Sequence, residues 1–179
     1  MRILPAAMAA LLVCSGAPLT AQVKVELEAG GGYTIVDVEA VADLDGEIAN
    51  DWGQGMYRFA ARAFLATMGN VEVGVEGAYQ YLYWYSVRVP YGPQPIYRTY
   101  DVNATTVAGV LRFKGASTTF DVDGGVAFLS DPVAMVGGSV GWSPVDKVTI
   151  RLRADGLLGH EVTVPVGLHL SYSLGPLGG

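Results

Sequence analysis

Alternation of apolar and polar residues over positions 71–89 is the feature of this sequence that most restricts its fold. The odd-numbered positions there carry Val or Tyr except at Gly77, whereas the even-numbered positions include Glu72, Glu76 and Arg88. Because successive side chains on a strand point to opposite faces, this period of two predicts a strand with one apolar and one polar face. The run is longer than the roughly 9 to 11 residues with which a tilted strand crosses a bilayer.

The same period recurs along most of the chain. It is clear in 105–114, 119–128 and 148–155, and weaker in 23–38, 55–66, 132–142 and 161–174. In 23–38 the apolar parity changes after Gly30–Gly32, so we expect a bulge or bend at these glycines. The sequence therefore predicts eight strands.

The connections between these strands alternate in length. Short turn sequences occupy 67–70, 114–117 and 143–146, and the intervening links lie at 41–53, 88–98, 130–132 and 159–160. The first two of these links are the longest. An even number of strands places both termini on the short-turn side.

An amphipathic sheet must hide one face, and closure into a barrel also removes its unpaired edges. Two closed barrels fit the alternation. A soluble, lipocalin-like carrier turns its apolar face inward around a ligand, whereas an outer-membrane barrel turns it outward into lipid.

Aromatic residues of the apolar parity favour the membrane barrel. They fall near the two ends of the predicted strands, as interfacial girdles do. The set near the long links is Tyr33, Tyr57, Tyr83, Tyr85 and Phe128, and the set near the short turns is Phe113, Phe120 and Tyr172.

Charged residues collect on the opposite, inward parity. Eight strands leave an interior just wide enough for side chains to fill, so charges of both signs should pair there and plug the lumen. An ion pathway is the alternative. The set is Arg58, Arg62, Glu72, Glu76, Arg112, Lys114, Asp121, Asp123, Arg151, Arg153 and Asp155.

This pattern resembles the small eight-stranded outer-membrane β-barrels of Gram-negative-type bacteria, broadly the transmembrane domain of outer-membrane protein A and its smaller relatives. The resemblance covers nearly all of 23–174. It includes Gly167, Leu170 and Tyr172, which match the C-terminal assembly signal Gly-x-x-apolar-x-aromatic, although Pro165 and the extension 174–179 depart from that family. The resemblance implies an all-β, up-and-down transmembrane barrel with both termini in the periplasm. It also implies outer-membrane lipid and the barrel assembly machinery as partners.

The N-terminus is consistent with export. Residues 1–21 contain Arg2, an apolar stretch and small residues before Ala21, which is the layout of a signal peptide. Cleavage after Ala21 leaves a barrel domain of 22–179 and removes Cys14, the only cysteine. A lipidation site at Cys14 is the alternative, but Val13 fits a lipobox poorly.

Composition narrows the function classes further. With 51% hydrophobic and 16% charged residues, the chain fits a single folded domain and not a disordered one. Its net charge of −6 and scattered basic residues exclude the electrostatic footprint of a nucleic-acid-binding protein. We expect a monomer without cofactor, serving envelope structure or surface contact through loops 41–53 and 88–98.

Two chemical alternatives arise from local motifs. The acidic loop 43–51 offers oxygen ligands for calcium but lacks the glycine position and ligand series of an EF-hand, so we predict a solvated loop and no metal site. His169-Leu-Ser171 resembles the His-x-Ser pair of lipid A deacylases, in which imidazole activates serine. No Asn follows Ser171 and both residues have inward parity, so we predict no enzymatic activity.

Overall fold

The structure, a computed structural model, describes residues 19–20, 23–35, 49–89, 96–159 and 162–177. These residues form ten strands. Their bounds are β1 Leu19–Thr20, β2 Val23–Ile35, β3 Ala49–Gly53, β4 Gly55–Met68, β5 Val71–Val89, β6 Ile96–Lys114, β7 Thr118–Phe128, β8 Pro132–Val145, β9 Val148–Leu158 and β10 Val162–Leu177. Within the described residues, no helix is long and apolar enough to cross a membrane.

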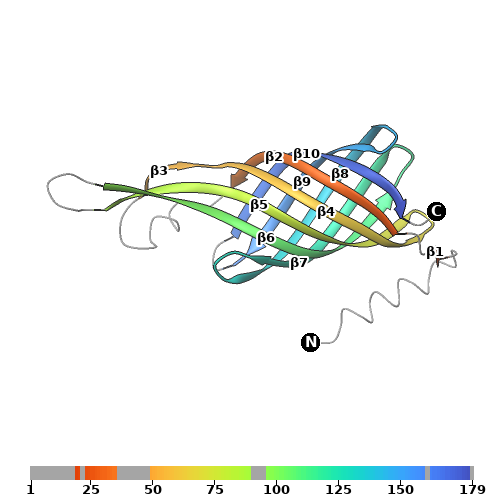
Figure 1. Cartoon of the computed structure of the whole chain (residues 1–179), viewed down its shortest axis with the longest axis horizontal. Helices are drawn as coiled ribbons and strands as arrows, with labels where there is room; N and C mark the ends of the chain where they lie inside the picture. Colours follow the sequence, from red (N-terminus) through yellow and green to blue (C-terminus); the bar gives the residue numbers. More distant parts are fainter. Residues whose placement is uncertain (1–18, 21–22, 36–48, 90–95, 160–161, 178–179) are drawn as a thin grey trace.

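Eight of the strands close into an antiparallel barrel. From β4 to β10 each strand pairs with the next in the chain, and β2 pairs with both β4 and β10. The first and last barrel strands therefore complete the ring, which is visible in Figure 1 as a cylinder of tilted strands. The predicted all-β, eight-stranded, up-and-down fold is confirmed.

One hairpin extends well past the rest of the barrel. The pairing of β6 with β7 begins only at Thr105, whereas β5 and β6 pair from Val71–Phe113 out to Val89–Ile96. The short strand β3 pairs with the outer part of β5, and Figure 1 shows these three strands projecting from one end of the cylinder.

The projecting strands correct two predictions. The strand expected at 105–114 begins at Ile96, and the flanks of the expected loop 88–98 are paired strand. The expected loop 41–53 includes β3, and its residues 41–48 lie outside the described part of the chain. Sequence alternation could not show that hydrogen bonding between β5 and β6 continues beyond the barrel.

The bulge or bend predicted at Gly30–Gly32 is wrong, because β2 is a continuous strand there. The pairing of β2 runs without a register shift from Lys24 to Tyr33 on β4 and from Glu26 to Ile35 on β10. Tyr33 stays on the exposed face with Leu27. The positions of changed parity, Val36 and Val38, lie outside the described residues.

The barrel is inverted relative to a soluble protein. Its outer face carries exposed large apolar side chains on every barrel strand, including Leu27, Phe59, Val107, Phe120 and Leu168. Its inner face carries the buried charged and polar side chains. This facing is opposite to that of a lipocalin-like carrier, whose apolar face surrounds its ligand.

Close approach of β10 explains the glycine at position 32 and gives a test of strand packing. A Cβ atom on Gly32 would lie 2.1 Å from the Val166 carbonyl oxygen and 2.4 Å from the Gly167 Cα. We expect Gly32→Ala to push β2 and β10 apart and to lower the free energy of unfolding by about 1–3 kcal/mol, measured by urea titration in detergent micelles. Gly77→Ala is the control, because a Cβ atom there meets nothing within 4 Å. Equal stability of the two variants would contradict this packing.

Candidate functional site in the barrel interior

The structure brings the predicted charged residues together inside the barrel. All are buried except Lys114, whose side chain is 34% exposed at the short-turn end. The five arginines are each at most 2% exposed. The inward-facing members come from five strands: Arg58 and Arg62 from β4, Glu72 and Glu76 from β5, Arg112 and Lys114 from β6, Asp121 and Asp123 from β7, and Arg151, Arg153 and Asp155 from β9.

Arg112 is the centre of the charge cluster nearer the short turns. Its guanidinium donates to both carboxylate oxygens of Glu26 at 2.6 and 2.8 Å, and to both of Asp121 at 2.8 and 3.0 Å. Arg151 also donates to Asp121, at 2.8 Å. The Phe64 ring lies against the Arg112 guanidinium, 4.1 Å from centroid to central carbon. Such two-pronged pairs fix geometry as well as charge.

Glu76 is the centre of the next cluster along the axis. It accepts hydrogen bonds from Arg58, from Arg62 Nε at 2.6 Å and from Arg153 Nη2 at 3.3 Å. Arg153 Nη2 also donates to Asp123, at 2.5 Å. Three cations thus share one carboxylate, so their charge must be balanced by further acids.

Sequence reasoning missed two acids on β2 that supply this balance, Glu26, which pairs with Arg112, and Glu28. The carboxylate oxygens of Glu28 lie 2.6 Å from Arg58 Nη1, 2.8 Å from Arg62 Nη2 and 3.6 Å from Arg151 Nε. Glu28 therefore joins the two clusters. The signal was present, because Val23, Val25 and Leu27 on the apolar parity place Glu26 and Glu28 on the opposite one.

With these acids included, the described interior is balanced in charge. Seven acidic side chains face seven basic ones, counting the two half-exposed lysines at the short-turn mouth. The acids are Glu26, Glu28, Glu72, Glu76, Asp121, Asp123 and Asp155, and the bases are Lys24, Arg58, Arg62, Arg112, Lys114, Arg151 and Arg153. Pairing of this kind offsets the cost of removing each charge from water.

An inward glycine makes room for part of this network. A Cβ atom on Gly137 would lie 2.3 Å from Asp155 Oδ1 and 2.6 Å from Asp123 Oδ2. Asp155 also lies 2.8 Å from Arg153 Nε and accepts a hydrogen bond from Gln80 at 3.1 Å. A side chain at position 137 would displace these carboxylates, which explains the glycine at this position of β8.

An apolar cluster occupies the part of the lumen nearer the long links. Leu82, Met135 and Leu157 are buried there with the small side chains of three alanines. Met135 and Leu157 lie next to the links before β8 and after β9, which places this cluster at the long-link end. The complete cluster is Leu82, Ala104, Ala108, Ala127, Met135 and Leu157, with Tyr83, Val102, Leu129 and Val133 packed against it. The interior is therefore closed in two different ways along its axis.

The candidate catalytic pair lies within the charged half. Ser171 Oγ accepts from Arg151 Nε at 2.8 Å and donates to Glu28 at 3.1 Å, and His169 Nδ1 lies 3.2 Å from Glu28. Both side chains are buried in the lumen, where Ser171 is engaged by the ion-pair network and not by His169.

Among the described residues, no group of three His, Cys, Asp or Glu side chains is arranged to hold a metal ion. The acidic residues at positions 43–47 lie outside that part of the chain.

The predicted girdle and assembly residues lie mostly on the outer face. Tyr33, Tyr57, Phe113, Phe120, Phe128, Leu170 and Tyr172 are exposed, and the rings of Tyr85 and Tyr100 stack at 5.3 Å. Tyr83 differs, because a bulge between Tyr81 and Tyr83 turns it toward the apolar cluster. Gly167 faces inward, where a Cβ atom would lie 2.8 Å from His169 Nε2. The role of Gly167, Leu170 and Tyr172 in assembly stays a prediction.

Comparison with known proteins places the fold. No family model matches the sequence, and no curated protein matches it significantly. The N-terminal β-barrel domain of Pseudomonas aeruginosa OprF superposes with a TM-score of 0.52 at 16% identity, covering 87% of this chain and 100% of that domain. The chain has the fold of the small outer-membrane β-barrels. The outer-membrane protein Ail of Yersinia pestis, in a phospholipid bilayer nanodisc, gives a TM-score of 0.50 at 13% identity, covering 84% of this chain and 99% of that one.

Substitutions of two basic residues on β6 measure how much the interior ion pairs contribute to the free energy of unfolding of this outer-membrane-type barrel. Arg112→Met leaves Glu26 and Asp121 without their two-pronged partner, so we expect a loss of about 3–5 kcal/mol in the free energy of unfolding, reduced where water enters the lumen. Lys114→Met removes one half-exposed pair with Glu72, and we expect at most about 1 kcal/mol. Urea unfolding in micelles, followed by tryptophan fluorescence, measures both. Similar losses for the two variants would contradict a network centred on Arg112.

Proposed function

We propose that the protein is a monomeric, non-enzymatic barrel of the outer membrane, with a sealed lumen and a projecting sheet for surface contact. The observation that carries this proposal is the inverted distribution of side chains. Apolar residues cover the outside of the closed barrel, and paired charges fill its inside. Lipid is the solvent in which that arrangement is favourable, since an apolar wall of this extent in water would drive aggregation.

The proposed orientation follows from the connections. The short turns lie at one end of the barrel, where Val23, the first residue of β2, pairs with Leu177, the last residue of β10. The β3–β5–β6 sheet projects from the other end (Figure 1). Outer-membrane barrels have short periplasmic turns and longer extracellular loops, so the projecting sheet would face the cell exterior. Contact with other surfaces is thus a role this sheet could perform, in addition to strengthening the envelope.

The non-enzymatic part of the proposal rests on where the reactive side chains lie. His169 and Ser171 are buried among ion pairs, away from the lipid-facing wall on which an acyl substrate would arrive. A hydrolase also needs a serine whose hydroxyl is free to attack, and Ser171 Oγ already bonds Arg151 and Glu28.

Fractionation tests the proposed location. We expect the mature protein in the outer-membrane fraction, with the export segment 1–21 removed, and we expect its gel mobility to shift on boiling because the closed barrel resists detergent when cold. N-terminal sequencing of the membrane-bound form identifies the cleavage site. Release of the folded protein into the soluble periplasm would contradict the proposal.

Planar-bilayer recording tests the sealed lumen. The ion-paired half and the apolar half each block the interior, and an eight-stranded barrel is too narrow for side chains and a wide water column together. We therefore expect no large, stable conductance steps from the purified protein, with a wide porin in the same bilayer as the positive control. Such steps from the wild-type protein would replace the sealed barrel with a small channel.

A further inference from the structure

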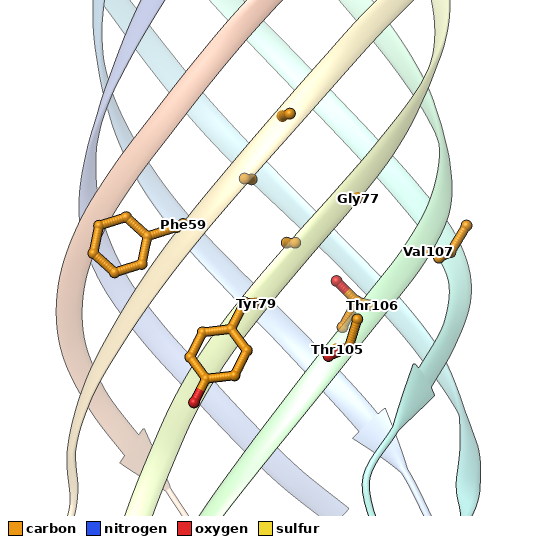
Figure 2. A pocket seen from close by; sticks show the side chains of 9 residues that line it. Phe59, Gly77, Tyr79, Thr105, Thr106 and Val107 are labelled. Atoms are coloured by element: carbon orange, nitrogen blue, oxygen red, sulfur yellow. The ribbon is translucent and has the colours of Figure 1, made fainter.

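A hollow of about 350 Å³ interrupts the apolar outer wall across β4, β5 and β6. Figure 2 shows Phe59 on one side of it and Val107 on the other, with Gly77 between them and Tyr79 toward one end. Its remaining lining comes from Ala60, Ala61, Ala78, Thr105 and Thr106.

Strand register explains why the wall is hollow at this place. Ala61, Gly77 and Val107 are direct cross-strand neighbours, so two of the three outward positions in that row carry little or no side chain. The next row contains Phe59 and Tyr79, whose rings rise above it. A Cβ atom on Gly77 would meet nothing within 4 Å, so the space above Gly77 is open.

The hollow is bordered at one end by polar groups on the same strands. The Tyr79 hydroxyl donates to Asn103 at 2.8 Å, and the Tyr81 hydroxyl donates to Asp101 at 3.0 Å. The ring of Tyr57 stacks on that of Tyr81 at 5.0 Å. At about 3.3 Å per residue, Tyr79 lies only about 7 Å along β5 from Gly77. An apolar hollow and a hydrogen-bonding edge are therefore adjacent, with the polar edge toward the projecting sheet.

We propose that this hollow binds one acyl chain of an outer-leaflet glycolipid, whose sugar hydroxyls meet Asp101 and Asn103. The proposal rests on the membrane insertion proposed above, which brings lipid to this wall. A chain lying over Ala61 and Gly77 contacts side chains on both sides, and an unfilled hollow would lose those contacts. The polar edge offers acceptor oxygens, including a carboxylate, which suit hydroxyl donors and repel a bare phosphate.

A second copy of the chain fits this surface poorly. Two-fold association places the same patch of each subunit against the other, so two hollows would face each other and enclose a void. An acyl chain is narrow enough to fill the groove between Phe59 and Val107. An acyl chain therefore fits the hollow, whereas a symmetric partner leaves it empty.

The test uses the full barrel in nanodiscs containing equal amounts of phosphatidylcholine and diglucosyl diacylglycerol with identical chains. After release into mild detergent, native mass spectrometry counts the lipids retained. We expect one retained glycolipid per wild-type barrel, exceeding retained phosphatidylcholine. Gly77→Leu fills the hollow and should lower glycolipid retention about tenfold, the effect of losing contact with roughly two buried methylene groups. Gly109→Leu is the matched control, an outward glycine on β6 outside the hollow whose added Cβ comes no closer than 4.0 Å to another residue.

Headgroup recognition is tested separately. Tyr79→Phe keeps the ring but removes the hydroxyl that holds the Asn103 side chain in position. We therefore expect it to lower the preference for the sugar headgroup without lowering total lipid retention. Tyr172→Phe, at the short-turn end, should change neither quantity.

Three outcomes would overturn the proposal: equal retention by the Gly77→Leu and Gly109→Leu variants, equal retention of the two lipids by the wild type, or a dimer that Gly77→Leu abolishes. Heat-modifiability of every variant separates these results from a failure of membrane insertion itself.

Discussion

The rest of this structure depends on the mutual neutralisation of arginines and carboxylates inside a ring of eight strands. A single unpaired charge at that depth would be costly, whereas Arg112 and Glu76 each meet several opposite charges at hydrogen-bonding distance. The guanidinium group suits this task because its five donors reach two carboxylates at once. The network also dictates where side chains are absent, since Gly137 lies where Asp123 and Asp155 converge.

Period-two alternation was sufficient to predict the closed eight-stranded fold, because each strand separates water-compatible from lipid-compatible residues. The inward charged set could be obtained from parity on β4, β5, β6, β7 and β9. The predicted set lacked Glu26 and Glu28 on β2, where the three glycines Gly30–Gly32 interrupt the alternation of apolar and polar side chains. Those glycines were misread as a bulge because sequence shows only that a side chain is missing. Whether the reason is a bend or the close approach of β10 depends on pairing between the first and last barrel strands, which lie far apart in sequence.

The two parts of the lumen are packed with different kinds of side chain. Ion pairs occupy the part nearer the short turns, and Leu82, Met135 and Leu157 occupy the part nearer the long links. Parity alone did not predict this division, because Leu82 shares the inward parity of Glu72, Glu76 and Gln80, and Tyr83 enters the cluster only through the bulge after Tyr81. Apolar packing at one end removes the need to match further charges there. The ion pairs then need to balance only over the remaining length.

Strand β5 contributes both to the ion pairs inside the barrel and to the apolar wall outside it. Its even positions supply Glu72 and Glu76 to the ion pairs, while its odd positions form the wall that holds Gly77 and Tyr79. An inward substitution on β5 must respect charge balance and close packing with several strands. An outward substitution only has to remain compatible with the medium around the barrel, so the outer wall tolerates local variation in size. The hollow at Gly77 is therefore not required by the packing of the interior, and its shape is free to be set by what lies against the wall.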